Sequence, residues 1–117
     1  MTIANALASV AVGDIDAAAA WYRRILGDTG TRPMPEVAEW HFPRGGGLQV
    51  YLGPERAGHG SFTLAVTDLD AEIDRLDALG VDTSGRLDGP GVRTMIIRDP
   101  DGNSIAFAEA TDPRLVR

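Results

Sequence analysis

The sequence contains no cysteine, and that absence removes several kinds of chemistry. Without thiols the chain can form no disulfide, no thiolate metal site and no cysteine nucleophile. Long hydrophobic runs are missing too, because no apolar stretch approaches the roughly 20 residues that a membrane-spanning helix needs. The N-terminus also lacks a basic segment followed by an apolar one, as an export signal would have. We therefore expect a cytoplasmic protein with no membrane partner.

Basic residues are scarce. Lysine and arginine together number 11 against 17 aspartates and glutamates, so the formal net charge is −6 and the pI is about 4.7. Neutralisation of phosphates by basic side chains supplies most of the affinity for nucleic acid, so we expect no nucleic-acid partner. The acidity either serves solubility or weakly favours a cationic ligand. The length of 117 residues and the 44% of hydrophobic residues predict a single domain over 1–117.

The clearest positive signal is an internal repeat. Residues 11–17 (AVGDIDA) recur at 65–71 (AVTDLDA), about half the chain later. In both copies an alternating strand pattern comes before the segment, and a helical pattern follows it and ends at a Leu-Gly pair. Asp14 and Asp68 stand where a helix N-cap accepts hydrogen bonds from free backbone N–H groups. This arrangement indicates two copies of one supersecondary unit.

Each unit is predicted to run strand–helix–strand–strand–strand. The first unit covers about 5–53, the second about 60–110, and a polar tail covers 111–117. The Asp-Pro-Asp-Gly sequence at 99–102 predicts a tight turn between the last two strands. The predicted strands are 6–12, 30–34, 37–42 and 47–52 in the first unit, and 61–67, 82–87, 92–98 and 103–109 in the second.

Three segments carry a resemblance to a known superfamily. They are VGDI at 12–15 leading to WYRRILG at 21–27, AVTDLD at 65–70, and RDPDGNSI at 98–105. With them the chain resembles the vicinal oxygen chelate superfamily, which includes glyoxalase I, bleomycin-resistance proteins and extradiol dioxygenases. The resemblance implies an α+β fold in which two βαβββ repeats form an incomplete barrel around a concave pocket, usually in a homodimer. Because the segments are helix caps, core positions and a turn, they imply little about chemistry.

The resemblance also implies where a metal ion would be held. Metal-dependent members carry up to four ligands, one each from the first and last strands of the two units. Those positions hold Leu7, Ser61, Ala106 and, to within one residue, Gln49. A divalent ion needs at least three nitrogen or oxygen donors, and this set does not supply them. We therefore expect no metal, no other cofactor and no metal-dependent enzyme activity at the usual position.

A displaced metal site is one alternative. The histidines are His41 and His59, and Glu39 shares a strand face with His41. If the strand that starts at Ser61 extended backwards, His59 would point to the same side, and the three side chains could gather into a site. The simpler interpretation is one solvated loop histidine and one strand-surface histidine. No serine has a histidine convincingly beside it, so we predict no catalytic residue. Glu39 and Glu109 are lone strand carboxylates, with Glu109 expected at a strand end near the surface, and a glutamate that acts as a general base without a metal stays an alternative.

Strand alternation gives each strand an aliphatic face under the helices and a face of small, neutral side chains. The second face contains the four ligand positions and suits an uncharged or amphipathic organic ligand. Trp40 is either a stacking surface in this pocket or a core side chain, whereas Trp21 and Tyr22 are assigned to the core or to an interface. The predicted pocket residues are Leu7, Ser9, Trp40, Gln49, Tyr51, Ser61, Thr63 and Ala106.

These observations favour a metal-independent protein that binds, and so sequesters, a small organic or antibiotic molecule. Two other functions stay open: a metal-dependent enzyme that uses the displaced site, and a structural or interaction domain with an empty pocket. In the last case Tyr51, Trp40 and Gln49 would fill the cavity. The sequence is compatible with a barrel that closes within one chain and with one that closes across a dimer.

Overall fold

The first repeat forms a four-stranded sheet, called sheet A here, with one helix packed on it. The computed structural model describes residues 1–114. The strand order is β1-β4-β3-β2, with β1 parallel to β4 and the other neighbours antiparallel. The helix begins and ends as predicted, because Asp14 accepts from the Ala17 N–H at 3.1 Å and Gly27 adopts the left-handed conformation. The elements are β1 (Leu7–Val12), α1 (Ile15–Leu26), β2 (Thr31–Met34), β3 (Val37–His41) and β4 (Gly47–Leu52).

The second repeat forms a three-stranded sheet, called sheet B, with the order β5-β7-β6. Its first and last strands, β5 and β7, are parallel, just as β1 and β4 are in sheet A. Asp68 caps the helix by accepting from the Ala71 N–H at 3.0 Å. The elements are β5 (Ser61–Ala65), α2 (Leu69–Ala78), β6 (Val92–Arg98) and β7 (Ser104–Ala110).

The prediction of a strand at 82–87 is wrong. In the described residues the second repeat therefore has three strands in its sheet rather than the four of a full βαβββ unit. Only isolated bridges remain, from Arg86 to Met95 and from Gly89 to Val92. The physical reason lies in local hydrogen bonds: the Asp82 carboxylate accepts from the backbone N–H of Ser84 at 3.0 Å and from its hydroxyl at 2.7 Å. Such bonds offer the backbone an alternative to a strand ladder.

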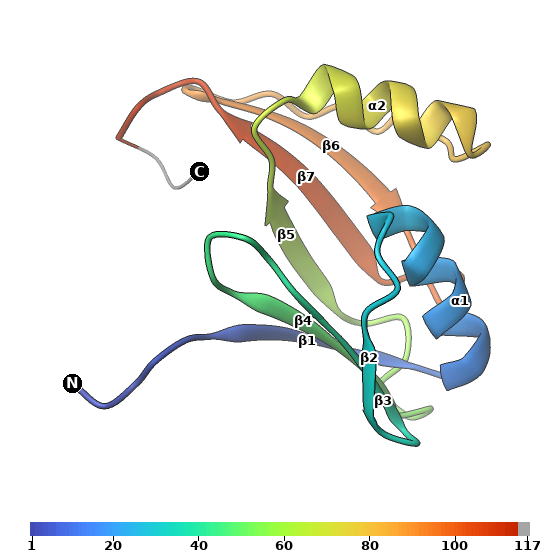
Figure 1. The fold of residues 1–117 in the computed structure, drawn as a ribbon. Helices are drawn as coiled ribbons and strands as arrows, with labels where there is room; N and C mark the ends of the chain where they lie inside the picture. Colours follow the sequence, from blue (N-terminus) through green and yellow to red (C-terminus); the bar gives the residue numbers. More distant parts are fainter. Residues whose placement is uncertain (115–117) are drawn as a thin grey trace.

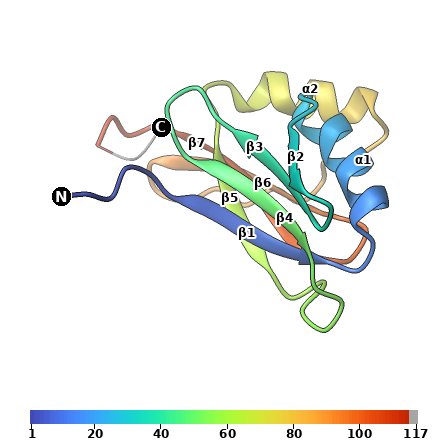
Figure 2. The same ribbon diagram turned by 60° about the horizontal axis from the view of Figure 1, so that its bottom comes forward.

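Both sheets contribute one face to a single hydrophobic core, and both helices contribute to it as well. In Figure 1 sheet A runs along the bottom, β6 and β7 pass above it, α1 lies at the right and α2 lies at the top. Figure 2 shows β1 and β4 side by side, with the helices beyond them. The largest buried side chains come from all these elements: Trp40, Tyr22, Phe107, Ile25, Leu48, Leu69, Leu76, Met95 and Ile105.

The shared core determines where the other two faces lie. Because each sheet turns its apolar face inwards, the faces of small and polar side chains lie on the outside of the chain and point away from one another. We call them the outer faces of sheets A and B. The α+β prediction is confirmed, and the described strands form two open sheets rather than a closed barrel.

A buried polar cluster joins the two repeats. The Asp99 carboxylate, 5% exposed, accepts from the Tyr22 hydroxyl at 2.8 Å and from the Asn103 side-chain amide at 2.8 Å. The same amide donates to the Ala11 carbonyl at 2.9 Å, at the end of β1. Burial, together with the neighbouring Asp99, raises the pKa of Tyr22 far above its ordinary value, so this hydroxyl stays protonated and keeps donating.

The structure bears on the predicted C-terminal tail in part and on the absence of a membrane-spanning helix in the described residues. The predicted tail at 111–117 falls partly outside the described residues, because 115–117 lie beyond them. Neither helix within residues 1–114 has the length and apolar character that crossing a membrane requires.

Candidate functional site

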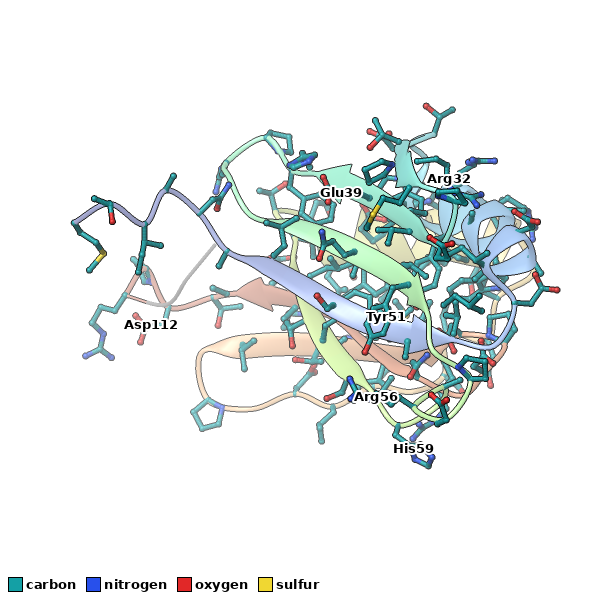
Figure 3. The ribbon with its side chains drawn as sticks, turned by 90° about the horizontal axis from the view of Figure 1, so that it is seen from below. Arg32, Glu39, Tyr51, Arg56, His59 and Asp112 are labelled. Carbon is teal, nitrogen blue, oxygen red and sulfur yellow. The ribbon has the colours of Figure 1, made fainter. Side chains whose placement is uncertain are left out.

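The outer face of sheet A brings together four of the predicted pocket residues. Leu7 and Ser9 lie on it from β1, and Gln49 and Tyr51 lie on it from β4. Strand register places Ser9 opposite Gln49, and Gln49 opposite Glu39 on β3. Figure 3 looks onto this face and shows Glu39 and Tyr51 on it.

A chain of hydrogen bonds crosses the middle of this face. The Gln49 amide donates to Glu39 Oε1 at 2.7 Å, and the Ser9 hydroxyl donates to Gln49 Oε1 at 3.5 Å. His41 Nε2 lies 2.7 Å from Glu39 Oε2. The bond from Gln49, and then the bond to His41, hold the pKa of Glu39 below its usual range. Glu39 therefore carries a negative charge at neutral pH, on a side chain that is only 18% exposed.

The other three small predicted pocket residues lie on the outer face of sheet B. Ser61 and Thr63 are exposed on β5, and half-buried Ala106 is the register partner of Thr63 on β7. Within the described residues these three do not face Ser9 and Gln49 across a common cavity. The predicted pocket residues are thus divided into two groups, one on each sheet, and we call these groups half-sites.

Strand register supports the assignment of the four positions that hold the ligands in metal-dependent members of the superfamily, because the two repeats place them in the same way. Leu7 pairs with Gly47, two residues before Gln49, and Ser61 pairs with Ser104, two residues before Ala106. Neither Leu7 nor Ala106 has a donor atom, and the Gln49 amide already binds Glu39. A divalent ion would therefore find too few ligands at these positions.

The displaced metal site is not assembled. Glu39 and His41 are neighbours on β3, but His59 lies in the connection between the repeats, well away from Glu39 (Figure 3). Among residues 1–114, His, Cys, Asp and Glu side chains form no group of three or more that could hold a metal ion. The three-residue cluster considered from the sequence is therefore wrong for this part of the chain.

Trp40 belongs to the core and not to the pocket. It pairs with Leu48 across β3 and β4, is 2% exposed, and donates from Nε1 to the Asp28 carbonyl at 2.9 Å. Its ring lies 6.0 Å from that of Tyr22, which is also buried, as predicted. Since Trp40 is buried in the core, it does not join Tyr51 and Gln49 on the outer face. The prediction of a pocket tryptophan is wrong.

Sequence reasoning missed two polar contacts. It treated Glu39 as a lone carboxylate, because its pairing with Gln49 depends on how the turn after β3 sets the register of the hairpin. It placed Glu109 at a strand end, whereas Glu109 accepts from the Leu69 N–H at 2.7 Å and so caps the start of α2. The negative charge suits the positive end of the helix dipole.

Comparison with known proteins identifies the family. Residues 8–108 match the family model described as a glyoxalase-like domain. The chain belongs to the glyoxalase-like family. This membership supports the assignment to the vicinal oxygen chelate superfamily that the sequence segments indicated. A comparison with curated proteins gives no match.

Several solved structures share the fold of this glyoxalase-like chain. A glyoxalase/bleomycin resistance protein from Catenulispora acidiphila is 42% identical, with a TM-score of 0.82 over 92% of this chain and 99% of that chain. An antibiotic-binding protein from a Streptomyces species is 27% identical, with a TM-score of 0.78 over 94% and 98%. A lactoylglutathione lyase from Agrobacterium tumefaciens is 23% identical, with a TM-score of 0.78 over 96% and 97%, and shares the fold alone.

Proposed function

We propose that this glyoxalase-like chain is a metal-independent binding protein for a small organic molecule that carries a cationic group. The observation that carries the proposal is the outer face of sheet A. There an ionised Glu39 is oriented by Gln49, and Leu7 occupies the position of a metal ligand, as Ala106 does on sheet B. The similarity to an antibiotic-binding protein supports the same kind of function.

Glu39 is the anchor of the proposed site. Its carboxylate is held in place by hydrogen bonds with His41 on its own strand and Gln49 on the neighbouring strand, so a ligand ammonium or guanidinium group meets a preorganised partner. Because the side chain is only 18% exposed, the attraction is screened less than that of a surface charge. Tyr51, half-buried two residues from Gln49, supplies an apolar ring for the body of the ligand.

The proposal includes a homodimer, because one chain supplies only half of each site. The outer faces of sheets A and B point away from one another, so a cleft between them needs sheet A of one copy and sheet B of another. Leu7, 38% exposed on sheet A, is an apolar residue that such a partner would cover. A twofold pair of copies would form two equivalent clefts.

The test uses metal-free bleomycin, a cationic natural product, as the probe. Binding is measured by calorimetry before and after dialysis of the protein against a chelator, and the metal content of the purified protein is measured by mass spectrometry. We expect saturable binding that chelation leaves unchanged. Glu39→Gln should weaken it about 10- to 100-fold, as expected for a lost charge-assisted hydrogen bond worth about 1.5–3 kcal/mol.

Glu36→Gln is the matched control, since it makes the same charge change at an exposed position just before β3. It should leave bleomycin affinity within about twofold, as a remote surface charge does. One metal ion bound per chain and lost together with binding on chelation would overturn metal independence. Equal losses in the two variants, or no saturable binding, would overturn the role of Glu39 in holding a cationic ligand.

A further inference from the structure

A groove of about 940 Å³ lies between the two repeats, on the core side of both sheets. We call it the inter-repeat groove. Sheet A borders it through Leu48, sheet B through Phe62 and Leu64, and the first turn of α2 through Ala71. The loop between β3 and β4 forms the remaining side through Phe42. The groove is therefore separate from the outer face that carries Glu39, although Thr63 of the edge strand β5 borders it as well.

Most of the lining of the inter-repeat groove is apolar, and the core does not fill it. Leu48 is fully buried, whereas Phe42, Phe62 and Leu64 belong to the edge of the core cluster and stay partly exposed. Partly exposed aromatic and aliphatic side chains gain free energy when an apolar molecule displaces water from them. The space is also at the upper end of the range of about 300–1,000 Å³ that small-molecule sites occupy.

The rim of the inter-repeat groove carries two basic and two acidic side chains, so its formal charges balance: Arg44, Arg75, Asp68 and Glu72. Arg44 already takes part in an interaction within the chain. Arg75 donates from Nε to Glu72 at 2.9 Å, so these two opposite charges neutralise one another. The Asp68 carboxylate is used at the N-cap of α2, where it accepts from the Ala71 N–H. A charged ligand would have to leave water for an apolar floor without a dedicated partner, which is costly. The lining and rim together favour an uncharged molecule.

We propose that the inter-repeat groove is a second binding site, which takes one small, uncharged apolar molecule with an aromatic or acyl body. This ligand differs in chemistry from the cationic molecule proposed for the outer faces, and none of Glu39, Gln49, Tyr51 and Ala106 lines the groove. The chain would then hold a polar ligand and an apolar ligand on opposite sides of the same sheets.

The test uses 1-N-phenylnaphthylamine, a neutral apolar dye that fluoresces when it leaves water. We expect saturable binding at one dye per chain. Ala71→Trp should weaken it at least tenfold, because the indole would occupy the groove beside Phe62 and Leu64. Ala78→Trp is the matched control, since Ala78 is an exposed alanine of the same helix, seven residues further on and outside the lining, and it should bind the dye normally.

Two more variants keep the outcome decisive. Ala71→Leu, a conservative change for a helix, should weaken dye binding by less than Ala71→Trp does, and it covers the case in which the tryptophan variant fails to fold. Ala106→Trp, on the outer face of sheet B, should leave dye binding unchanged even where it abolishes bleomycin binding. Dye binding that does not saturate, that is absent because a second copy covers the groove, or that is equal in the Ala71 and Ala78 variants would overturn the proposal.

Discussion

Asp99 shows how much one residue of a turn can contribute to this fold. Its Oδ1 accepts from the backbone N–H groups of Asp101 and Asn103 at 3.0 and 2.9 Å, while Oδ2 accepts from Tyr22 and the Asn103 side chain. A buried carboxylate is tolerated only when its oxygens are satisfied in this way. Because Tyr22 belongs to α1 and Asp99 follows β6, the hydrogen bond between them ties one repeat to the other.

We expect Tyr22→Phe to lower the free energy of unfolding by about 2 kcal/mol, because it removes a buried hydrogen bond to a charged group. Urea unfolding followed by circular dichroism measures this loss. Tyr51→Phe is the control, because the Tyr51 hydroxyl is half-buried on an outer face and its removal should change stability by less than about 0.5 kcal/mol. Equal stability of the two variants would show that the Tyr22 hydroxyl does not stabilise the link between repeats.

At the scale of elements, local patterns predicted most of the secondary structure. Caps at Asp14 and Asp68 depend on near neighbours in sequence, so both helix starts were found. Alternation likewise separated the core faces of the strands from the outer faces. The alternation that placed Glu39 and His41 on one face also places Trp40 on the other, so the position of Trp40 was available from the sequence.

Other features of the elements depend on contacts between distant residues and could not be predicted in the same way. The segment 82–87 has a plausible composition for a strand, but the Asp82 side chain bonds to Ser84, and within this segment only Gly85 and Leu87 hydrogen-bond to β6. The link from Glu39 to Gln49 depends on hairpin register. The inter-repeat groove depends on how two sheets and a helix pack, which no local pattern encodes.

The connection between the repeats packs closely against the turn that contains Asp101, and alanine substitutions at two glycines can test this packing. Gly58 and Gly80 both have positive φ, at 86° and 80°, but a Cβ on Gly58 would clash with the Asp101 carbonyl oxygen. A Cβ on Gly80 would meet nothing within 4 Å. Gly80→Ala should therefore cost only the left-handed conformation, about 1–2 kcal/mol.

Gly58→Ala should cost more than Gly80→Ala, because it adds a backbone clash to the same conformational cost. The difference in thermal midpoint between the two variants, measured by calorimetry, isolates the clash. If both alanine variants melt at the same temperature, the connection moves freely away from the turn that contains Asp101, and the close packing of the two segments contributes no stability.

At the scale of the whole molecule, the outward direction of the two half-sites gives the proposed dimer a sharp test. Glu39→Gln damages the half-site on sheet A, and Ala106→Trp blocks the half-site on sheet B. If each cleft combines sheet A of one copy with sheet B of its partner, a dimer of the two variants contains one doubly damaged cleft and one intact cleft. Neither variant alone has an intact cleft.

Equal amounts of the two variants, unfolded and refolded together, should therefore recover bleomycin binding in about a quarter of all clefts, as random pairing requires. Calorimetry gives the number of sites, and sedimentation confirms the pairing. Recovery of none would mean that each site is built within one chain. Wild-type chains refolded in parallel provide the full number of sites for comparison.

The parallel pairing of β1 with β4, and of β5 with β7, has a consequence for how the chain acquires its structure. Leu7 must find Gly47, and Ser61 must find Ser104, so each repeat closes a long loop before its first and last strands can bond. Loop closure is an entropic cost that non-local contacts repay only once they form. Folding dominated by such pairings proceeds in milliseconds to seconds rather than microseconds. Until these loops close, β1 and β5 are not hydrogen-bonded to their partners, because β4 and β7 are the last strands of their repeats in the sequence.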